Sequence, residues 1–166
     1  KERLEFYSEL KEIIYFYNPS SILDLGCGLN PIALAKKDIY YYVYDIKESE
    51  LKLIKEHFNK NKLKGEVFLQ DITKASDFPE TDICLILKVL DILESKEKAE
   101  ELIKKIKSRI IIASFSTKTL SGKPMNYPRR FWFEKLLEKL KYKFKILNFH
   151  NEIFYIIKKT MDHHTL

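Results

Sequence analysis

The sequence predicts an α/β fold: a largely parallel, seven-stranded sheet with helices on both faces and an antiparallel hairpin at the C-terminal end. Apolar, strand-like segments alternate with helical segments five times along the chain. This order is typical of parallel strands joined by right-handed helical crossovers. The last two apolar segments are separated only by His150 and Asn151, which indicates a tight hairpin.

The first half of the chain supplies three of the strands. A helical period of apolar residues (Leu4, Tyr7, Leu10, Ile14 and Tyr17) predicts a helix within 1–18, near the cofactor site, that ends before Pro19. Apolar runs rich in β-branched and aromatic residues predict strands at 21–25, 39–45 and 66–71. Amphipathic patterns predict helices at 31–37 and 48–63.

The second half supplies the remaining four strands. Residues 82–88 are apolar on both faces, as expected of a strand in the middle of a parallel sheet. Further strands are predicted at 109–115, 143–149 and 152–158, helices at 95–107 and 129–141, and a loop at 116–128. We expect one domain over 1–160 and a disordered tail at 161–166.

Composition excludes several classes of protein. The chain of 166 residues has 30 basic and 24 acidic side chains, a net charge of +6, which fits either a solvated lysine-rich surface or a polyanionic partner. No apolar run reaches the roughly 18 residues of a membrane span, and no signal peptide is visible. Cys27 and Cys84 fall in the predicted core, so we expect a reduced, cytoplasmic protein. We also expect a monomer. His163 and His164 in the tail make a poor metal site, and no metal is assigned.

The stretch "SILDLGCGLNPIAL" at 21–34 predicts a ligand-binding turn. Gly26 and Gly28 let the backbone turn sharply and approach a ligand closely. Asn30 is expected to cap the following helix, with Pro31 at its first position. A dinucleotide-binding turn would have a glycine at position 31, and no Gly-Lys-Ser/Thr follows as in a P-loop.

Three aspartates follow the predicted strands in order. Asp24 lies in the first, Asp45 ends the second and Asp71 ends the third. A carboxylate at position 45 can accept hydrogen bonds from two ribose hydroxyls. Asp71 can accept from an adenine amino group, and Ile72 can cover the adenine ring. This order resembles the cofactor site of class I S-adenosylmethionine-dependent methyltransferases, which have a Rossmann-like fold.

The region after the fourth strand bears on the atom that is methylated. It reads "LKVLDILE" and lacks the Asp/Asn-Pro-Pro-aromatic motif common in adenine amino methylation. Neither cysteine is placed to attack a pyrimidine ring. Guanine N7 remains a good target, because it has an in-plane lone pair and no proton to remove. Catalysis would then depend on positioning and not on a base.

Segments along nearly the whole chain resemble one family, the small-subunit rRNA (guanine-N7)-methyltransferases that confer aminoglycoside resistance. The similar segments are "ERL" at 2–4, "ILDLGCGLNPIAL", "YDI" at 44–46, "QDI" at 70–72, "LKVLDILE" at 87–94, "SFSTKTLSG" at 114–122, "WFE" at 132–134 and "NEIFYIIKK" at 151–159.

The resemblance implies roles for individual residues. Cofactor contacts are implied at Arg3, Gly26, Gly28, Asp45, Ile46, Asp71, Ile72 and Leu87, with Arg3 meeting the cofactor carboxylate. Lys88 and Lys118 match cationic positions that face the RNA, and Glu152 matches a glutamate near the target, so these three are the candidate catalytic residues. Asp24 is added to the cofactor-binding set from its place before the glycine turn.

The chain departs from the family in two places. It begins just after the helical N-terminal region with which family members dock on the ribosomal subunit, either because that region was removed or because this is a minimal form. In addition, the loop after "STKTL" reads "SGKPMNYPRRF", where the family has a glycine-rich "GGRxKGM"-like stretch. Both differences concern the choice of target.

The loop before the last helix combines cations and aromatic residues. Lys118, Lys123, Arg129 and Arg130 are expected to contact RNA phosphates, and Tyr127 to stack on an extruded base. Trp132 could either stack on RNA or be buried at the start of the helix, whereas Phe131 is expected to be buried.

The sequence therefore predicts an S-adenosylmethionine-dependent methyltransferase acting on guanine N7 in structured RNA, with the small ribosomal subunit as the partner that the resemblance implies. Two alternatives remain open: a methyltransferase acting on tRNA or a small molecule, and a non-catalytic protein of the same fold that binds RNA or S-adenosylmethionine.

Overall fold

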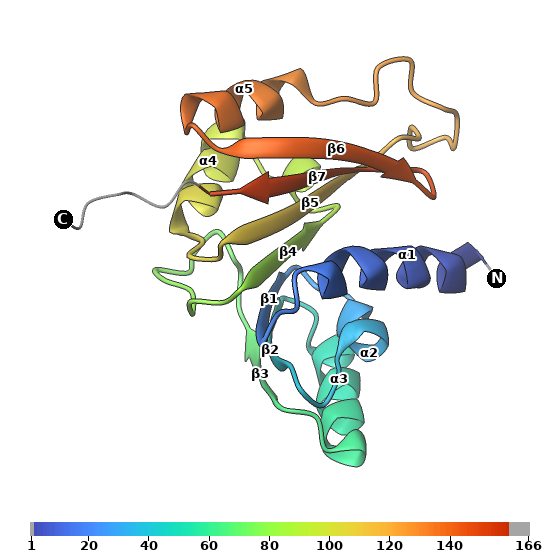
Figure 1. The fold of residues 1–166 in the computed structure, drawn as a ribbon, viewed down its shortest axis with the longest axis vertical. Helices are drawn as coiled ribbons and strands as arrows, with labels where there is room; N and C mark the ends of the chain where they lie inside the picture. Colours follow the sequence, from blue (N-terminus) through green and yellow to red (C-terminus); the bar gives the residue numbers. More distant parts are fainter. Residues whose placement is uncertain (1, 160–166) are drawn as a thin grey trace.

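A seven-stranded sheet crosses the molecule in the order β3-β2-β1-β4-β5-β7-β6 (Figure 1). The structure is a computed structural model that describes residues 2–159, with side chains from residue 4 onward. Strands β1 to β5 are parallel, and β7 pairs antiparallel with both β5 and β6. The strands are β1 Ser21–Leu25, β2 Tyr40–Asp45, β3 Gly65–Leu69, β4 Ile83–Leu87, β5 Ile110–Ser116, β6 Lys143–Phe149 and β7 Glu152–Lys158.

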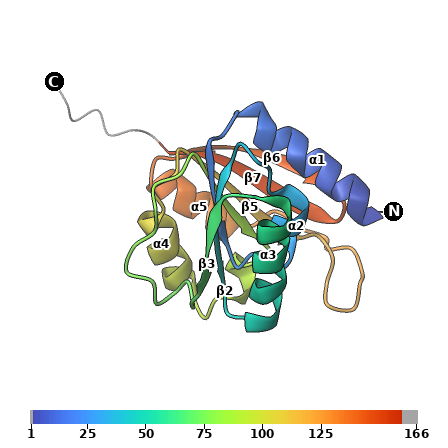
Figure 2. The same ribbon diagram turned by 90° about the horizontal axis from the view of Figure 1, so that it is seen from below.

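Helices cover both faces of the sheet (Figure 2). One face carries α1 Glu2–Phe16, α2 Asn30–Leu34 and α3 Glu48–Asn61, and the other carries α4 Lys96–Lys105 and α5 Phe131–Lys139. The predicted α/β architecture, including the C-terminal antiparallel strands, is therefore confirmed.

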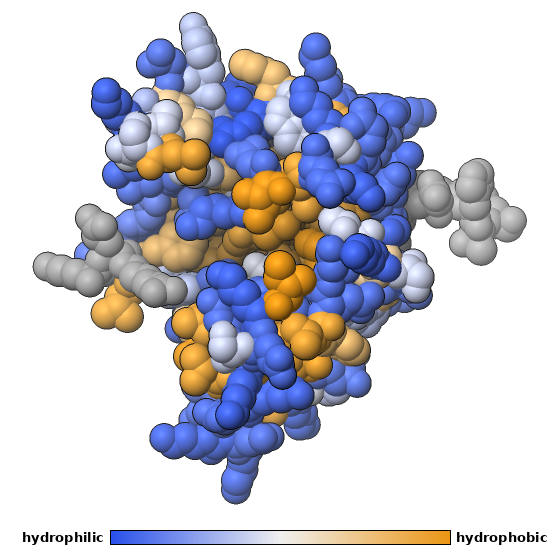
Figure 3. Space-filling model, turned by 180° about the vertical axis from the view of Figure 1, so that it is seen from behind, coloured by the Kyte–Doolittle hydropathy of each residue, from blue (hydrophilic) through white to orange (hydrophobic). Residues whose placement is uncertain are grey.

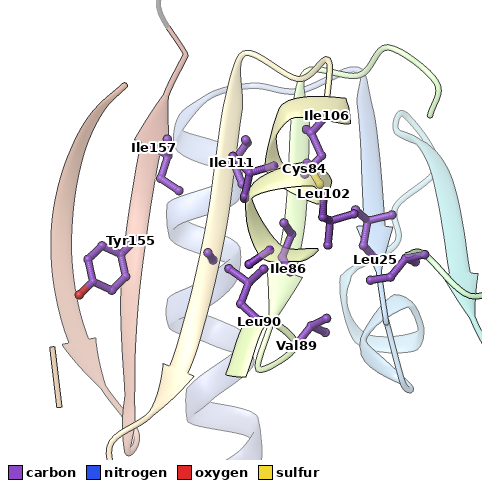
Figure 4. Packing of buried hydrophobic residues seen from close by; sticks show 14 of the residues in the cluster. Leu25, Cys84, Ile86, Val89, Leu90, Leu102, Ile106, Ile111, Tyr155 and Ile157 are labelled. Carbon is purple, nitrogen blue, oxygen red and sulfur yellow. The ribbon is translucent and has the colours of Figure 1, made fainter. Parts of the chain in front are cut away.

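Successive side chains of a strand point to opposite faces of the sheet, so the sheet separates two hydrophobic cores. On β4, Ile83 and Leu85 pack toward α1 and α3, while Cys84 and Ile86 pack toward α4 and α5. Figure 4 shows the second of these cores, where Leu102 and Ile106 lie over the sheet beside Cys84 and Ile111. All five residues of β4 are buried, as expected of a central parallel strand.

Several element boundaries match the sequence predictions. Strands β1, β6 and β7 have the predicted bounds. His150 and Asn151 both have positive φ, 49° and 63°, as a two-residue hairpin turn of right-handed twist requires.

Other boundaries differ from the prediction. Helix α2 ends at Leu34 because Ala35 is extended, with ψ of 143°. Strand β3 ends at Leu69, so Asp71 lies in the loop beyond it and not at the strand end. A short 3₁₀ helix at Leu90–Ile92, not predicted, follows β4.

On the face opposite to the view of Figure 1, apolar side chains gather around a hollow near the middle of the molecule (Figure 3). Among the helices of residues 2–159, none combines the length and the apolar character needed to cross a bilayer. The predicted tail at 161–166, with its two histidines, lies outside the described residues.

Candidate functional site

The turn after β1 is built by two glycines in the left-handed region of backbone space. Gly26 has φ of 65° and Gly28 has φ of 52°, and a β-carbon on Gly26 would lie 2.7 Å from Val89 Cγ2. The Gly26 N–H donates to the carbonyl of Tyr44 (2.9 Å), which ties the turn to β2. A residue with a side chain would therefore be strained at position 26 and would also clash.

The turn opens into a cavity of about 560 Å³, here called the glycine-turn cavity. It lies at the carboxyl ends of β1, β2 and β4, where parallel α/β sheets bind ligands. Its lining includes predicted cofactor residues from four separate segments: Gly26, Gly28, Asp45, Ile46, Asp71, Ile72 and Leu87, together with Lys88. The fold thus brings these predicted residues to one place.

Asp45 holds the glycine turn in shape. Its Oδ2 accepts from the Gly28 N–H (2.9 Å), and its Oδ1 accepts from the N–H groups of Ile46 (2.7 Å) and Lys47 (3.0 Å). The carboxylate therefore organises both the turn and the start of α3.

A second carboxylate, that of Asp71, lines the glycine-turn cavity. Asp71 Oδ1 accepts from the N–H and the hydroxyl of Thr73, at 2.9 and 2.7 Å, and these bonds lower the pKa of Asp71. Ile72 is buried beside it, while Ile46 and Ile92 expose 70% and 79% of their surface. An acceptor with apolar side chains around it is what an adenine ring requires.

Asp24 does not line this cavity, so the structure does not bring it together with the other predicted cofactor residues. Its side chain is fully buried on the face covered by α1, α2 and α3, where Oδ2 accepts a hydrogen bond from the Tyr41 hydroxyl (2.6 Å). Its Oδ1 is buried and has no hydrogen-bond partner among the described residues. Burial raises the pKa of Asp24 from 3.8 to about 7.

The raised pKa of Asp24 predicts a pH-dependent stability. Because folding favours the neutral acid, the stabilisation from this group is fully present below pH 3.8 and is lost as the pH rises through about 7. Relative to wild type, Asp24→Asn is therefore expected to gain a few degrees in unfolding midpoint at pH 8 and to gain less at pH 4. Thermal unfolding of both proteins across this range measures the difference, with the exposed Asp38→Asn as a control. An advantage of Asp24→Asn that did not grow with pH would contradict the assignment.

A second cavity, of about 620 Å³, adjoins the first at Leu87 and Lys88, which line both. We call it the Glu152 cavity; its other lining residues are Glu5, Phe6, Tyr7, Asn30, His150, Asn151 and Glu152. Lys88 sits at the junction with a positive φ of 56°. Such a conformation is uncommon outside glycine, and it occurs here at the point where two sites meet.

Glu152 is the buried carboxylate of this cavity. Its Oε1 accepts from the Ser114 hydroxyl (2.8 Å), and Ser114 Oγ in turn accepts from the Lys88 N–H (3.1 Å). Burial raises the pKa of Glu152, and the Ser114 bond and the charge of Lys88 offset part of that rise. Two of the three candidate catalytic residues, Lys88 and Glu152, are thus joined through Ser114.

Helix α1 forms a wall of the Glu152 cavity. The Tyr7 hydroxyl donates to Asn30 Oδ1 (2.7 Å), so Asn30 contacts α1 and its side chain does not cap α2, contrary to the prediction. Phe6 packs against Phe149 and Phe154, at ring-centre distances of 5.9 and 6.0 Å. The side chain of Arg3, predicted to meet the cofactor carboxylate, lies outside the described residues.

The basic loop after β5 is anchored beside the Glu152 cavity. The Thr117 N–H donates to the carbonyl of Asn151 (2.8 Å), and Lys118 pairs with Pro124 across a small turn. Lys118 and Lys123 are exposed, and neither has an ion-pair partner within residues 2–159. Tyr127 is 80% exposed. These three side chains are therefore free to meet a partner.

The two arginines of the loop make internal contacts instead. Arg130 binds Asp91 (Nη2 to Oδ2, 2.7 Å), the carbonyl of Ser116 (2.9 Å) and the carbonyl of Pro128, with its side chain only 11% exposed. Arg129 pairs with the carboxylate of Glu134 and lowers its pKa. These contacts hold Arg130 within the protein and do not leave it free for phosphates as the sequence predicts. Arg129 is committed to Glu134 but remains about half exposed.

Arg130→Ala is expected to lower the free energy of unfolding by about 2 kcal/mol, because the carboxylate and carbonyl oxygens that it binds lose their donors. Urea denaturation measures this loss. The matched variant Lys123→Ala is expected to stay within about 0.5 kcal/mol of wild type, as for an exposed side chain. An Arg130→Ala protein as stable as wild type would contradict the structural role.

The aromatic residues at the start of α5 differ from expectation. Phe131 was expected to be buried but exposes 56% of its surface. Trp132, for which the sequence allows either environment, is half-buried against Phe115 and Phe133 and lines neither of the two cavities. Packing against α4 and β5, which are distant in sequence, decides which of the two rings turns inward.

The cysteines and acidic residues form no further catalytic or metal centre in the part of the chain that is described. Cys27 and Cys84 are unpaired and buried. Burial, helped by the charges of Asp24 and Asp45, raises the pKa of the Cys27 thiol, so it is not an activated nucleophile. Within residues 2–159, no three His, Cys, Asp or Glu residues are grouped so that they could hold a metal ion.

Comparison with solved structures identifies similar folds. The 16S rRNA methylase RmtB is 26% identical with a TM-score of 0.75, covering 96% of this chain and 64% of that one. The corresponding values for the 16S rRNA methylase ArmA are 26%, 0.74, 96% and 85%. The 16S rRNA methyltransferase RmtF in complex with S-adenosyl-L-homocysteine shares the fold, with a TM-score of 0.81 at 24% identity, and the alignment covers 96% of this chain and 64% of that one.

Sequence comparison leads to the same group. The 16S rRNA (guanine(1405)-N(7))-methyltransferase of Micromonospora rosea is 27% identical over 165 residues, covering 93% of this chain and 59% of the relative. The enzyme of that name from Serratia marcescens is 29% identical over 140 residues, covering 81% and 56%. The chain spans about three-fifths of the length of these relatives. The family model "Ribosomal RNA methyltransferase (FmrO)" matches residues 1–156, and the chain therefore belongs to the FmrO family of ribosomal RNA methyltransferases.

Proposed function

We propose that this protein transfers a methyl group from S-adenosylmethionine to N7 of a guanine in small-subunit ribosomal RNA. The observation that carries the proposal is the junction of two cavities at Leu87 and Lys88. One cavity has the groups that a nucleoside needs, and the other has a buried carboxylate and opens beside a basic loop. A donor and an acceptor could therefore meet at that junction.

The residues of the glycine-turn cavity fit the proposed cofactor. The α-carbon of Gly28 faces open space, since a β-carbon there would meet only Glu50, at 3.9 Å. Asp45 would hold the ribose side, and Asp71 and Ile72 would hold the adenine. When bound, S-adenosylmethionine supplies an electrophilic methyl group on its sulfonium.

The groups of the Glu152 cavity suit a target that needs orientation more than activation. Guanine N7 carries a lone pair and no proton, so the protein needs no strong base there. A carboxylate can accept hydrogen bonds from the N1–H and amino groups of guanine, which adenine does not offer in that arrangement. Glu152, held by Ser114, would therefore select and orient the base.

The exposed Lys118, Lys123 and Tyr127 support an RNA partner. The cations would contact phosphates and the tyrosine ring would stack on an unpaired base. Because the loop is anchored on Asn151, a backbone bound there would place a base close to the Glu152 cavity. Action on ribosomal RNA would place the protein in the cytoplasm. We propose that it acts there as a monomer.

Incubation with tritium-labelled S-adenosylmethionine and 30S subunits, free 16S rRNA, tRNA or a small-molecule extract tests the proposal. Label in 16S rRNA, alone or within the subunit, is expected. Label only in tRNA or in small molecules would favour a different methyltransferase. Binding of S-adenosylhomocysteine without transfer to any RNA would indicate a non-catalytic protein.

A further inference from the structure

We propose that Glu50, on the first turn of α3, is a second acceptor for the ribose hydroxyls of the cofactor, beside Asp45. This inference rests on the proposed cofactor and specifies how this chain holds its ribose.

Asp45 has little acceptor capacity left. An ionised carboxylate offers about four lone-pair positions. Three of them accept backbone N–H groups, from Gly28, Ile46 and Lys47. The Cys27 thiol also lies 3.8 Å from Oδ2. A ribose with two free hydroxyls donates two hydrogen bonds, so a second acceptor beside Asp45 would let both hydroxyls bond while Asp45 keeps its bonds to the turn.

Glu50 is a carboxylate of the glycine-turn cavity that lacks a full set of partners. It lines the glycine-turn cavity, and its Oε2 is buried without a hydrogen-bond partner among the described residues. A β-carbon on Gly28 would lie 3.9 Å from this oxygen, so the Glu50 carboxylate lies close to the turn that Asp45 holds.

The contacts that Glu50 makes within the chain do not explain its position. Its Oε1 lies 3.7 Å from Lys47 Nζ, but the Lys47 side chain is 66% exposed and an ion pair of this kind contributes little. A buried carboxylate oxygen without a donor is unfavourable. Because the last torsion of a glutamate has a broad distribution, the carboxylate can turn an oxygen toward a donor in the cavity.

Isothermal calorimetry with S-adenosylhomocysteine tests the inference without any RNA. Glu50→Ala is expected to weaken binding about tenfold, as for the loss of a charge-assisted hydrogen bond. Glu50→Gln keeps one acceptor oxygen and is expected to weaken it about threefold. Glu48→Ala is the matched control, because Glu48 lies on the same helical turn, is exposed and does not line the cavity. Circular dichroism verifies that each variant is folded.

The 2′-deoxy and 3′-deoxy analogues of S-adenosylhomocysteine identify the contact. The loss caused by Glu50→Ala is expected to vanish with the analogue that lacks the hydroxyl bound by Glu50, and to persist with the other. Wild-type affinity in Glu50→Ala, or an equal loss with both analogues, would overturn the inference while leaving the proposed function intact. A wild-type protein that did not bind S-adenosylhomocysteine would overturn the proposed cofactor, and the inference with it.

Discussion

Asp45→Ala is expected to weaken the binding of S-adenosylhomocysteine by about 100-fold or more. The substitution removes a proposed ribose acceptor and, at the same time, the oxygen that the Gly28 N–H contacts at 2.9 Å. The N–H groups of Ile46 and Lys47 lose their acceptor as well. The loss of two charge-assisted hydrogen bonds, one to the ribose and one to the Gly28 N–H, at about 1.5–3 kcal/mol each, accounts for the size of this effect.

Calorimetry measures the affinity of Asp45→Ala, and Asp38→Asn serves as control because it removes the same charge from the loop before β2, where the side chain is 73% exposed. The control is expected to bind like wild type. If Asp45→Ala is folded and its affinity falls less than about threefold, Asp45 does not organise a cofactor site.

Glu152→Gln is expected to reduce methyl transfer to RNA by about tenfold to 100-fold, while cofactor affinity changes less than twofold. The amide replaces a carboxylate oxygen with an N–H₂ group, which opposes the donors of a guanine edge. Glu152 lines only the second cavity, so the cofactor cavity stays intact. Ser114→Ala is expected to show a smaller loss, because Ser114 acts by orienting Glu152.

Single-turnover transfer from labelled S-adenosylmethionine to 16S rRNA, measured beside calorimetry, separates these two effects. The exposed Glu138→Gln on α5 is the matched control. Full transfer activity in Glu152→Gln would remove Glu152 from the target site. A parallel loss of cofactor affinity would mean that the two cavities do not act separately.

The fold could be predicted from the sequence largely because its signals are local. The buried run of β4 and the hairpin residues His150 and Asn151 are recognisable within a few positions of the chain. The ends of helices and strands are harder to predict where packing decides them. Helix α2, for example, ends at Leu34 and not at residue 37. The 3₁₀ turn at Leu90–Ile92 has no comparable local signal.

The site could be predicted only in part, because side-chain partners come from distant segments. The glycine turn places Gly26 and Gly28 at the cavity by backbone geometry alone. In contrast, Arg130 is withdrawn from the surface by Asp91, which is 39 residues away. Asp24 is similarly buried against Tyr41, and Ser114 is tied to Glu152, neither of which composition or spacing could show.

Nucleoside mass spectrometry of 16S rRNA, taken from 30S subunits treated with the protein and S-adenosylmethionine, tests the proposed activity most directly. We expect one additional 7-methylguanosine per 16S rRNA, and about tenfold to 100-fold less of it when the Glu152→Gln protein is used at the same concentration for a short reaction. A methyl group on another atom of guanine or on another base, or no methylated nucleoside at all, would contradict it.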